Sequence, residues 1–127
     1  MTPNTHLAID PRLCGTPVHL DTGHALVRLT TVPEMAADDR GLVHGGFVFG
    51  LADYAAMLAV NDPLVVLGAA EVRFVGPVRV GQIVEVTADV TETKGKRVVV
   101  SVMGRVLERV VLLGTFTTFV LDKHVLD

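Results

Sequence analysis

A histidine, two glycines and an aspartate are spaced so that they could act together on a carbonyl group. His44, Gly45 and Gly46 precede a long apolar stretch, in which Asp53 is the only charged residue before Val60. This stretch lacks the Ser, Thr, Asp or Asn that usually caps a helix. The backbone N–H groups of an uncapped helix start can bind an anion or stabilise a developing oxyanion. We therefore expect hydrogen-bond donors at Gly45 and Gly46, and a carboxylate nine residues after His44.

The apolar stretch itself is predicted to be one buried helix. Its apolar residues fall on every side of a helical projection, which is typical of a helix enclosed by other elements. Pro63 disfavours helical geometry for the preceding residue, so the helix should end near Asn61. A buried carboxylate without a partner destabilises a fold, so Asp53 has either a functional role or a structural partner such as Arg73. The sequence leaves both roles open.

Here the chain resembles the hotdog-fold acyl-CoA thioesterases, and most closely their phenylacetyl-CoA thioesterase-like branch. His44-Gly45-Gly46 followed by Leu51-Ala52-Asp53 is similar to the motif of that family. Residues 74–82, Phe-Val-Gly-Pro-Val-Arg-Val-Gly-Gln, resemble its aromatic-x-x-Pro-x-x-x-Gly segment, which joins two strands. The resemblance covers residues 17–120 and implies a sheet wrapped around the helix. It also implies a homodimer with a continuous sheet, often paired into a homotetramer, that binds acyl-CoA at the subunit interface.

The resemblance implies hydrolysis of an acyl-CoA thioester to a free acid and coenzyme A (CoA). The thioester carbonyl would accept hydrogen bonds from the N–H of Gly45, with Gly46 as a second donor. Asp53 of the facing subunit would act as a general base on water or as a nucleophile, and the sequence does not decide between them. His44 would orient the substrate or hydrogen-bond the loop backbone. No cofactor is expected, because CoA is part of the substrate.

Two candidate substrate-binding positions depart from the family pattern. Many relatives have Asn six residues before the histidine, where this chain has Asp38. Relatives also often have Ser or Thr at a position that helps to hold water, where this chain has Leu67 followed by Gly68. These differences leave the reaction rate and the acyl group open.

A third candidate is a basic cluster at a predicted hairpin. Lys94, Lys96 and Arg97 flank Gly95 between two alternating segments. They could bind the phosphates of CoA, or they could form an ordinary solvated turn. The sequence favours the solvated turn.

Alternating hydrophobic residues predict an antiparallel sheet with the helix packed on one face. One face of each segment is apolar and the other polar, as in half-buried strands. The expected strands cover residues 24–32, 64–75, 84–91, 97–106 and 110–121. Residues 1–20 contain three prolines and are expected to form an irregular lead-in. The pattern predicts an α+β fold in one domain over residues 1–127, with about five strands and one long apolar helix. The family resemblance adds that this is a hotdog fold, with the sheet wrapped around the helix.

Composition limits the classes of function and location. The 127 residues carry a net charge of −3, which gives no basic field for nucleic acid. The only cysteine, Cys14, excludes an internal disulfide, and the first residues lack a signal-peptide pattern, so a cytoplasmic protein is expected. The apolar helix resembles a membrane span in length, but Asp53 argues against insertion in a membrane. Half of the residues are hydrophobic, which favours self-association.

Other functions remain open at this point. A hotdog domain could bind acyl-CoA without catalysis, or act as a hydratase or dehydratase that uses a His and an acid on an enoyl thioester. Metal chemistry is not expected, because the five histidines show no ligand spacing.

Overall fold

The computed structural model describes residues 1–127 and contains one six-stranded sheet, one long helix and two short helical turns. In chain order the elements are α1 (Pro11–Cys14), β1 (Thr16–Asp21), β2 (His24–Thr30), η1 (Pro33–Met35), α2 (Gly45–Val60), β3 (Val65–Phe74), β4 (Ile83–Lys94), β5 (Arg97–Val106) and β6 (Arg109–Val120). The strand order is β1-β2-β4-β5-β6-β3, and all neighbours are antiparallel. The predicted α+β hotdog fold is confirmed, with six strands instead of about five.

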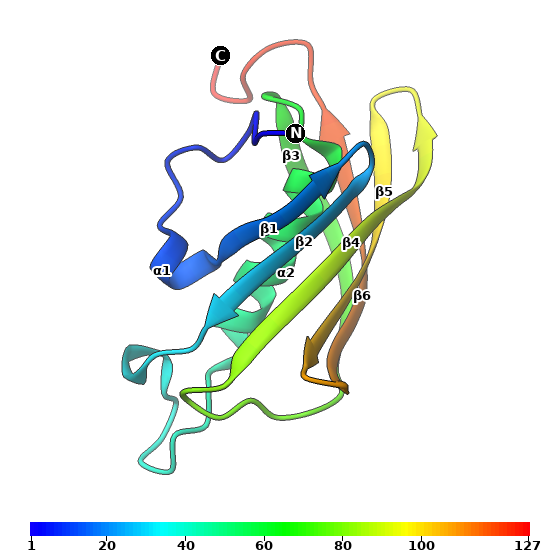
Figure 1. The fold of residues 1–127 in the computed structure, drawn as a ribbon. Coiled ribbons are helices and arrows are strands. Elements are labelled where there is room, and N and C mark those ends of the chain that lie inside the picture. The colour runs from blue at the N-terminus through cyan, green and yellow to red at the C-terminus, as the bar shows by residue number, and fades with distance from the viewer.

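The sheet curves around α2, which lies on its concave side (Figure 1). A cluster of 26 buried hydrophobic residues fills the space between them. The alternation that predicted the strands also determines which side chains enter this core. Val84, Val86 and Ala88 of β4 are fully buried, whereas the residues between them are partly exposed.

The strand that the sequence analysis missed is β1, in the predicted irregular lead-in. Only Leu20 of this strand is buried, so its alternation is weak. Pro17 also argued against a strand, but β1 lies at the edge of the sheet, where a missing N–H donor is tolerated. A register shift between Pro17 and His19 accommodates the proline. As an edge strand, β1 tolerates a proline and buries only one side chain. The same two properties kept it out of the prediction.

Helix α2 begins and ends close to the predicted residues. His44 is its N-cap, with extended backbone angles and no side-chain capping hydrogen bond. At the other end Asn61 adopts a left-handed conformation, with φ 54° and ψ 38°, and its N–H donates to Met57 O at 2.7 Å. None of the helices has the length and hydropathy that crossing a bilayer requires.

Strand β3 forms the second edge of the sheet and leaves one side of its backbone unpaired. It has ten residues, and most of its side chains from Gly68 onwards are exposed. A long unpaired edge can pair with another strand, including the same strand of a second copy. β3 is therefore the part of this fold that most readily extends the sheet.

Candidate functional site

The backbone at the start of α2 presents unused hydrogen-bond donors. Gly45 and Gly46 are the first two helical residues, so their N–H groups have no acceptor within the helix. Neither group donates to an acceptor elsewhere in the chain. The preceding loop is fixed, because Val43 N donates to Val78 O at 2.8 Å and His44 N donates to Met35 O at 2.9 Å. The N–H groups of Gly45 and Gly46 are therefore free to donate to a ligand, and backbone hydrogen bonds fix the loop that precedes them.

The His44 ring lies against the first turn of α2. It packs edge-on against Phe47, with ring centroids 6.1 Å apart and an interplanar angle of 82°. A Cβ atom at Gly46 would lie only 2.9 Å from His44 Nε2, so glycine is required for the ring to lie there. The ring makes no hydrogen bond to the loop backbone, which was one of its two expected roles. Its exposed position leaves it free to contact a ligand.

An apolar pocket of about 380 Å³ opens at Gly45. Its walls include Val48 of α2, Phe74 of β3 and the segment from Val75 to Val78. A Cβ atom at Gly45 would lie 3.5 Å from the Phe74 ring, so this ring is one wall beside the helix start. The two sequence segments that carry the family resemblance, 44–46 and 74–82, therefore meet at one pocket.

Asp53 is a partly buried carboxylate without a partner. Its Oδ1 is buried and accepts no hydrogen bond, and none of the six ion pairs of the chain includes it. Arg73, the structural partner that the sequence left open, is exposed and makes no ion pair with it. Burial raises the pKa of Asp53 from 3.8 to about 6. Within the chain, this carboxylate has no hydrogen-bond or ion-pair partner that would compensate for its burial.

Asp53 and Gly45 are too far apart along α2 to act on the same atom. Eight residues separate them, which corresponds to about 12 Å along the helix axis. Gly46, Gly50 and Asp53 follow one another at spacings of four and three, so they share one face of the helix. A Cβ atom at Gly50 would meet no atom within 4 Å, so there is open space over the middle of this face. Within one chain, the structure therefore does not bring Asp53 to the donors at Gly45.

Comparison with known proteins assigns the family. The family model of the thioesterase superfamily matches residues 40–112, which include the start of α2, Asp53 and the segment after β3. The chain belongs to the thioesterase superfamily. The uncharacterized protein PH1136 of Pyrococcus horikoshii is 52% identical, with a TM-score of 0.98 over 100% of this chain and 98% of that chain. A variant of the phenylacetic acid degradation protein PaaI of Thermus thermophilus is 29% identical, with a TM-score of 0.78 over 86% and 95%.

One curated relative carries the name of a different enzyme. A methylthioribose-1-phosphate isomerase of Aquifex aeolicus is 50% identical over 119 residues, which are 93% of this chain but 26% of that protein. The chain spans only 26% to 46% of the length of the curated relatives that it matches. Each of these relatives is therefore more than twice as long as the region that it shares with this chain.

Among the other candidates of this thioesterase-like chain, Asp38 has a structural role in the loop before His44. Its Oδ1 accepts hydrogen bonds from Arg40 N at 2.9 Å and Leu42 N at 3.1 Å. Leu67 packs against the core and brings no polar group to the site. Gly68 lies at a β3 bulge, where a Cβ atom would lie 2.4 Å from the Phe119 ring, so close packing explains the glycine.

The basic hairpin lies away from the start of α2. Lys96 Nζ pairs with Asp122 Oδ2 at 2.5 Å, and Arg97 Nη2 pairs with Glu92 Oε1 at 3.4 Å. Figure 1 shows the β4–β5 hairpin at the opposite end of the molecule from the N-terminus of α2. Within one chain, the structure therefore does not bring Lys94, Lys96 and Arg97 to Gly45, and it favours the solvated turn.

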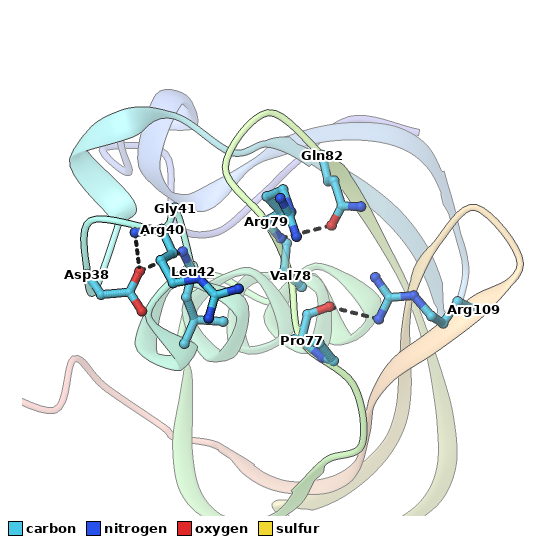
Figure 2. A pocket seen from close by; sticks show the side chains of 9 residues that line it. All are labelled: Asp38, Arg40, Gly41, Leu42, Pro77, Val78, Arg79, Gln82 and Arg109. Atoms are coloured by element: carbon cyan, nitrogen blue, oxygen red, sulfur yellow. Dashed lines mark hydrogen bonds between the residues drawn. The ribbon is translucent and has the colours of Figure 1, made fainter.

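A second pocket, which the sequence analysis did not identify, lies next to the apolar one. It has a volume of about 330 Å³ and includes Arg40, Arg79 and Arg109 (Figure 2). Pro77 and Val78 line both pockets. The three arginines are far apart in sequence, and no motif connects them. The structure brings them together through the bridge between Leu42 and Arg79 and through the Arg109 contact with Pro77.

Proposed function

We propose that this chain hydrolyses acyl-CoA thioesters at a site shared by two subunits. The observation that carries the proposal is Asp53, a partly buried carboxylate with no partner and a pKa of about 6, on the helix whose start opens into an apolar pocket. Membership of the thioesterase superfamily supports the reaction class. The resemblance of residues 44–53 and 74–82 to the motifs of acyl-CoA thioesterases supports CoA thioesters as substrates.

In this proposal the thioester carbonyl accepts a hydrogen bond from Gly45 N–H, with Gly46 N–H as a second donor. Both donors lie at the positive end of the α2 dipole, which stabilises the negative charge that develops on the carbonyl oxygen. The acyl group enters the apolar pocket beside Phe74. Donors that are already in place need no rearrangement during the reaction.

Asp53 of the partner then acts in one of two ways. As a general base it takes a proton from water while the water oxygen attacks the carbonyl carbon. The tetrahedral intermediate expels the CoA thiolate, which receives the proton. As a nucleophile, an Asp53 oxygen attacks the carbonyl carbon and forms a mixed anhydride, which water hydrolyses after the thiolate has left. Both routes require ionised Asp53.

A two-fold axis between antiparallel α2 helices would complete the site. The midpoint between residues 45 and 53 is residue 49, next to the open space at Gly50. An axis passing there places Asp53 of each chain beside Gly45 of the other, and it produces two identical sites. The unpaired β3 edge supports the same assembly, because two copies of β3 can join their sheets.

Activity should depend on pH through Asp53. Because the ionised form is required, kcat/KM should rise as pH increases through about 6 and then level off. Thiol release at low acyl-CoA concentration, measured across this range, gives the profile. A rate that is flat through this region, or that falls, would exclude Asp53 as base or nucleophile.

The shared site also requires self-association. Light scattering coupled to gel filtration should give at least twice the chain mass of 13.6 kDa, as a homodimer or homotetramer. A monomer that releases thiol at micromolar concentration would contradict the shared site. The measurement should be made at the concentration used for the activity assay, since dissociation would lower both signals together.

A further inference from the structure

We propose that the pocket formed by Arg40, Arg79 and Arg109, the arginine pocket, binds an anionic group of the molecule whose thioester lies at Gly45. This inference rests on the proposed function and identifies which substrates the site prefers. The chemistry that it recognises is a phosphate or carboxylate group.

The first argument is uncompensated charge. Three arginines take part in the six ion pairs of the chain, and none of them lines this pocket. The only acidic residue in its wall is Asp38, whose Oδ1 already accepts two backbone N–H groups. The pocket therefore has a net positive charge in a chain of net charge −3. Such a pocket attracts anions.

The second argument is that the arginines gather at one pocket with guanidinium donors still free. Arg109 Nη1 donates to Pro77 O at 2.7 Å, which holds the guanidinium over the segment after β3. Arg79 N donates to Gln82 Oε1 at 2.8 Å. In Figure 2 the Arg40 and Arg109 side chains extend toward Pro77 from opposite sides. The Arg109 guanidinium retains further free N–H donors, and the guanidinium groups of Arg40 and Arg79 make no hydrogen bond within the chain. Free guanidinium donors suit the paired oxygens of a phosphate or carboxylate.

The third argument is continuity with the thioester site. The arginine pocket shares Pro77 and Val78 with the apolar pocket at Gly45. Four residues separate Gly41 in one wall from Gly45, a distance of at most about 14 Å even if fully extended. One ligand can therefore occupy both pockets. Its anionic group is either a phosphate of CoA, reached through the pantetheine arm, or a carboxylate at the far end of the acyl group.

The test compares ligands that differ only in the anionic group. Calorimetry in the Asp53→Asn background, where hydrolysis is absent, measures binding of CoA, pantetheine, succinyl-pantetheine and butyryl-pantetheine. The binding variant is Arg40→Gln with Arg79→Gln, because Arg109 also holds Pro77 O. Arg105→Gln is the matched control, since Arg105 is exposed, has no ion pair and does not line the pocket. Thermal unfolding checks that each variant is folded.

If the anion is a phosphate of CoA, the double variant should weaken CoA binding at least about 10-fold and leave pantetheine binding unchanged. The loss should shrink as salt is added. If the anion is an acyl carboxylate, succinyl-pantetheine should bind more tightly than butyryl-pantetheine, and the double variant should remove that difference. Arg105→Gln should have no effect in either case.

Affinities that do not change in the folded double variant, for any of these ligands, would overturn the arginine pocket as a binding site. If they do not change while wild-type protein still releases thiol from acyl-CoA, the proposed function is retained and only this inference fails. Arginine-dependent binding in a protein that releases no thiol would support the arginine pocket and contradict the proposed hydrolysis.

Discussion

Replacing Asp53 by Asn should abolish thiol release from acyl-CoA and leave the protein as stable as before, or more stable. Burial raises the pKa of Asp53 in the folded state from 3.8 to about 6. The folded protein therefore binds this proton more tightly than the unfolded chain, so stability falls as pH rises from 3.8 through about 6. At neutral pH the ionised carboxylate costs on the order of 3 kcal/mol, which the neutral amide avoids. The expected loss in kcat is at least about 100-fold.

Thermal unfolding and thiol release on the same preparation measure both effects. Asp39→Asn is the matched control: it makes the same chemical change at an exposed aspartate without hydrogen bonds and should alter neither quantity. Strong destabilisation of Asp53→Asn, with activity retained in the folded fraction, would instead show that Asp53 has a structural role.

Replacing Gly45 by Pro should reduce kcat by about 100- to 1,000-fold, because it deletes one oxyanion donor. Proline is well tolerated at the first helical position, where its missing N–H breaks no helical bond. His44 has φ −62° and ψ 130°, which is the extended geometry that a residue before proline prefers. The change therefore removes the donor with little disturbance of the helix.

Gly45→Ala is the control for the added side-chain atoms. Its Cβ would lie 3.5 Å from the Phe74 ring, an ordinary contact, and its N–H remains. Alanine should therefore retain much more activity than proline. Equal losses for the two variants would mean that added bulk in the apolar pocket, and not the donor, limits the reaction.

The core of this fold could be predicted because its pattern is local. Alternating valines in β4 and β5 and the uninterrupted apolar helix each carry their own signal. Gly45 and Asp53 were proposed as site residues for a similar reason, since two glycines without a cap and one charge on an apolar helix are unusual within a short segment. The apolar pocket was only partly predictable. Phe74 is far from Gly45 in sequence, and the position of β3 in the sheet brings the two residues together.

The arginine pocket could not be predicted from sequence order. Arg40 and Arg79 lie in two separate connections and Arg109 is the first residue of β6, and each resembles an ordinary surface residue. The hairpin cluster of Lys94, Lys96 and Arg97 was more conspicuous because its charges are adjacent in sequence. Its ion pairs with Asp122 and Glu92 form because the strands bring these residues together. The local run of charges does not show which residues will meet.

Mixing the two inactive variants tests the shared site most directly. Asp53→Asn and Gly45→Pro chains, unfolded together and refolded at equal amounts, should give about half mixed dimers, each with one intact and one doubly altered site. The account predicts recovery of about a quarter of wild-type thiol release, although each variant refolded alone stays inactive. If Gly45 and Asp53 acted within one chain, every site would carry a defect. Activity no greater than that of the separate variants would contradict the account.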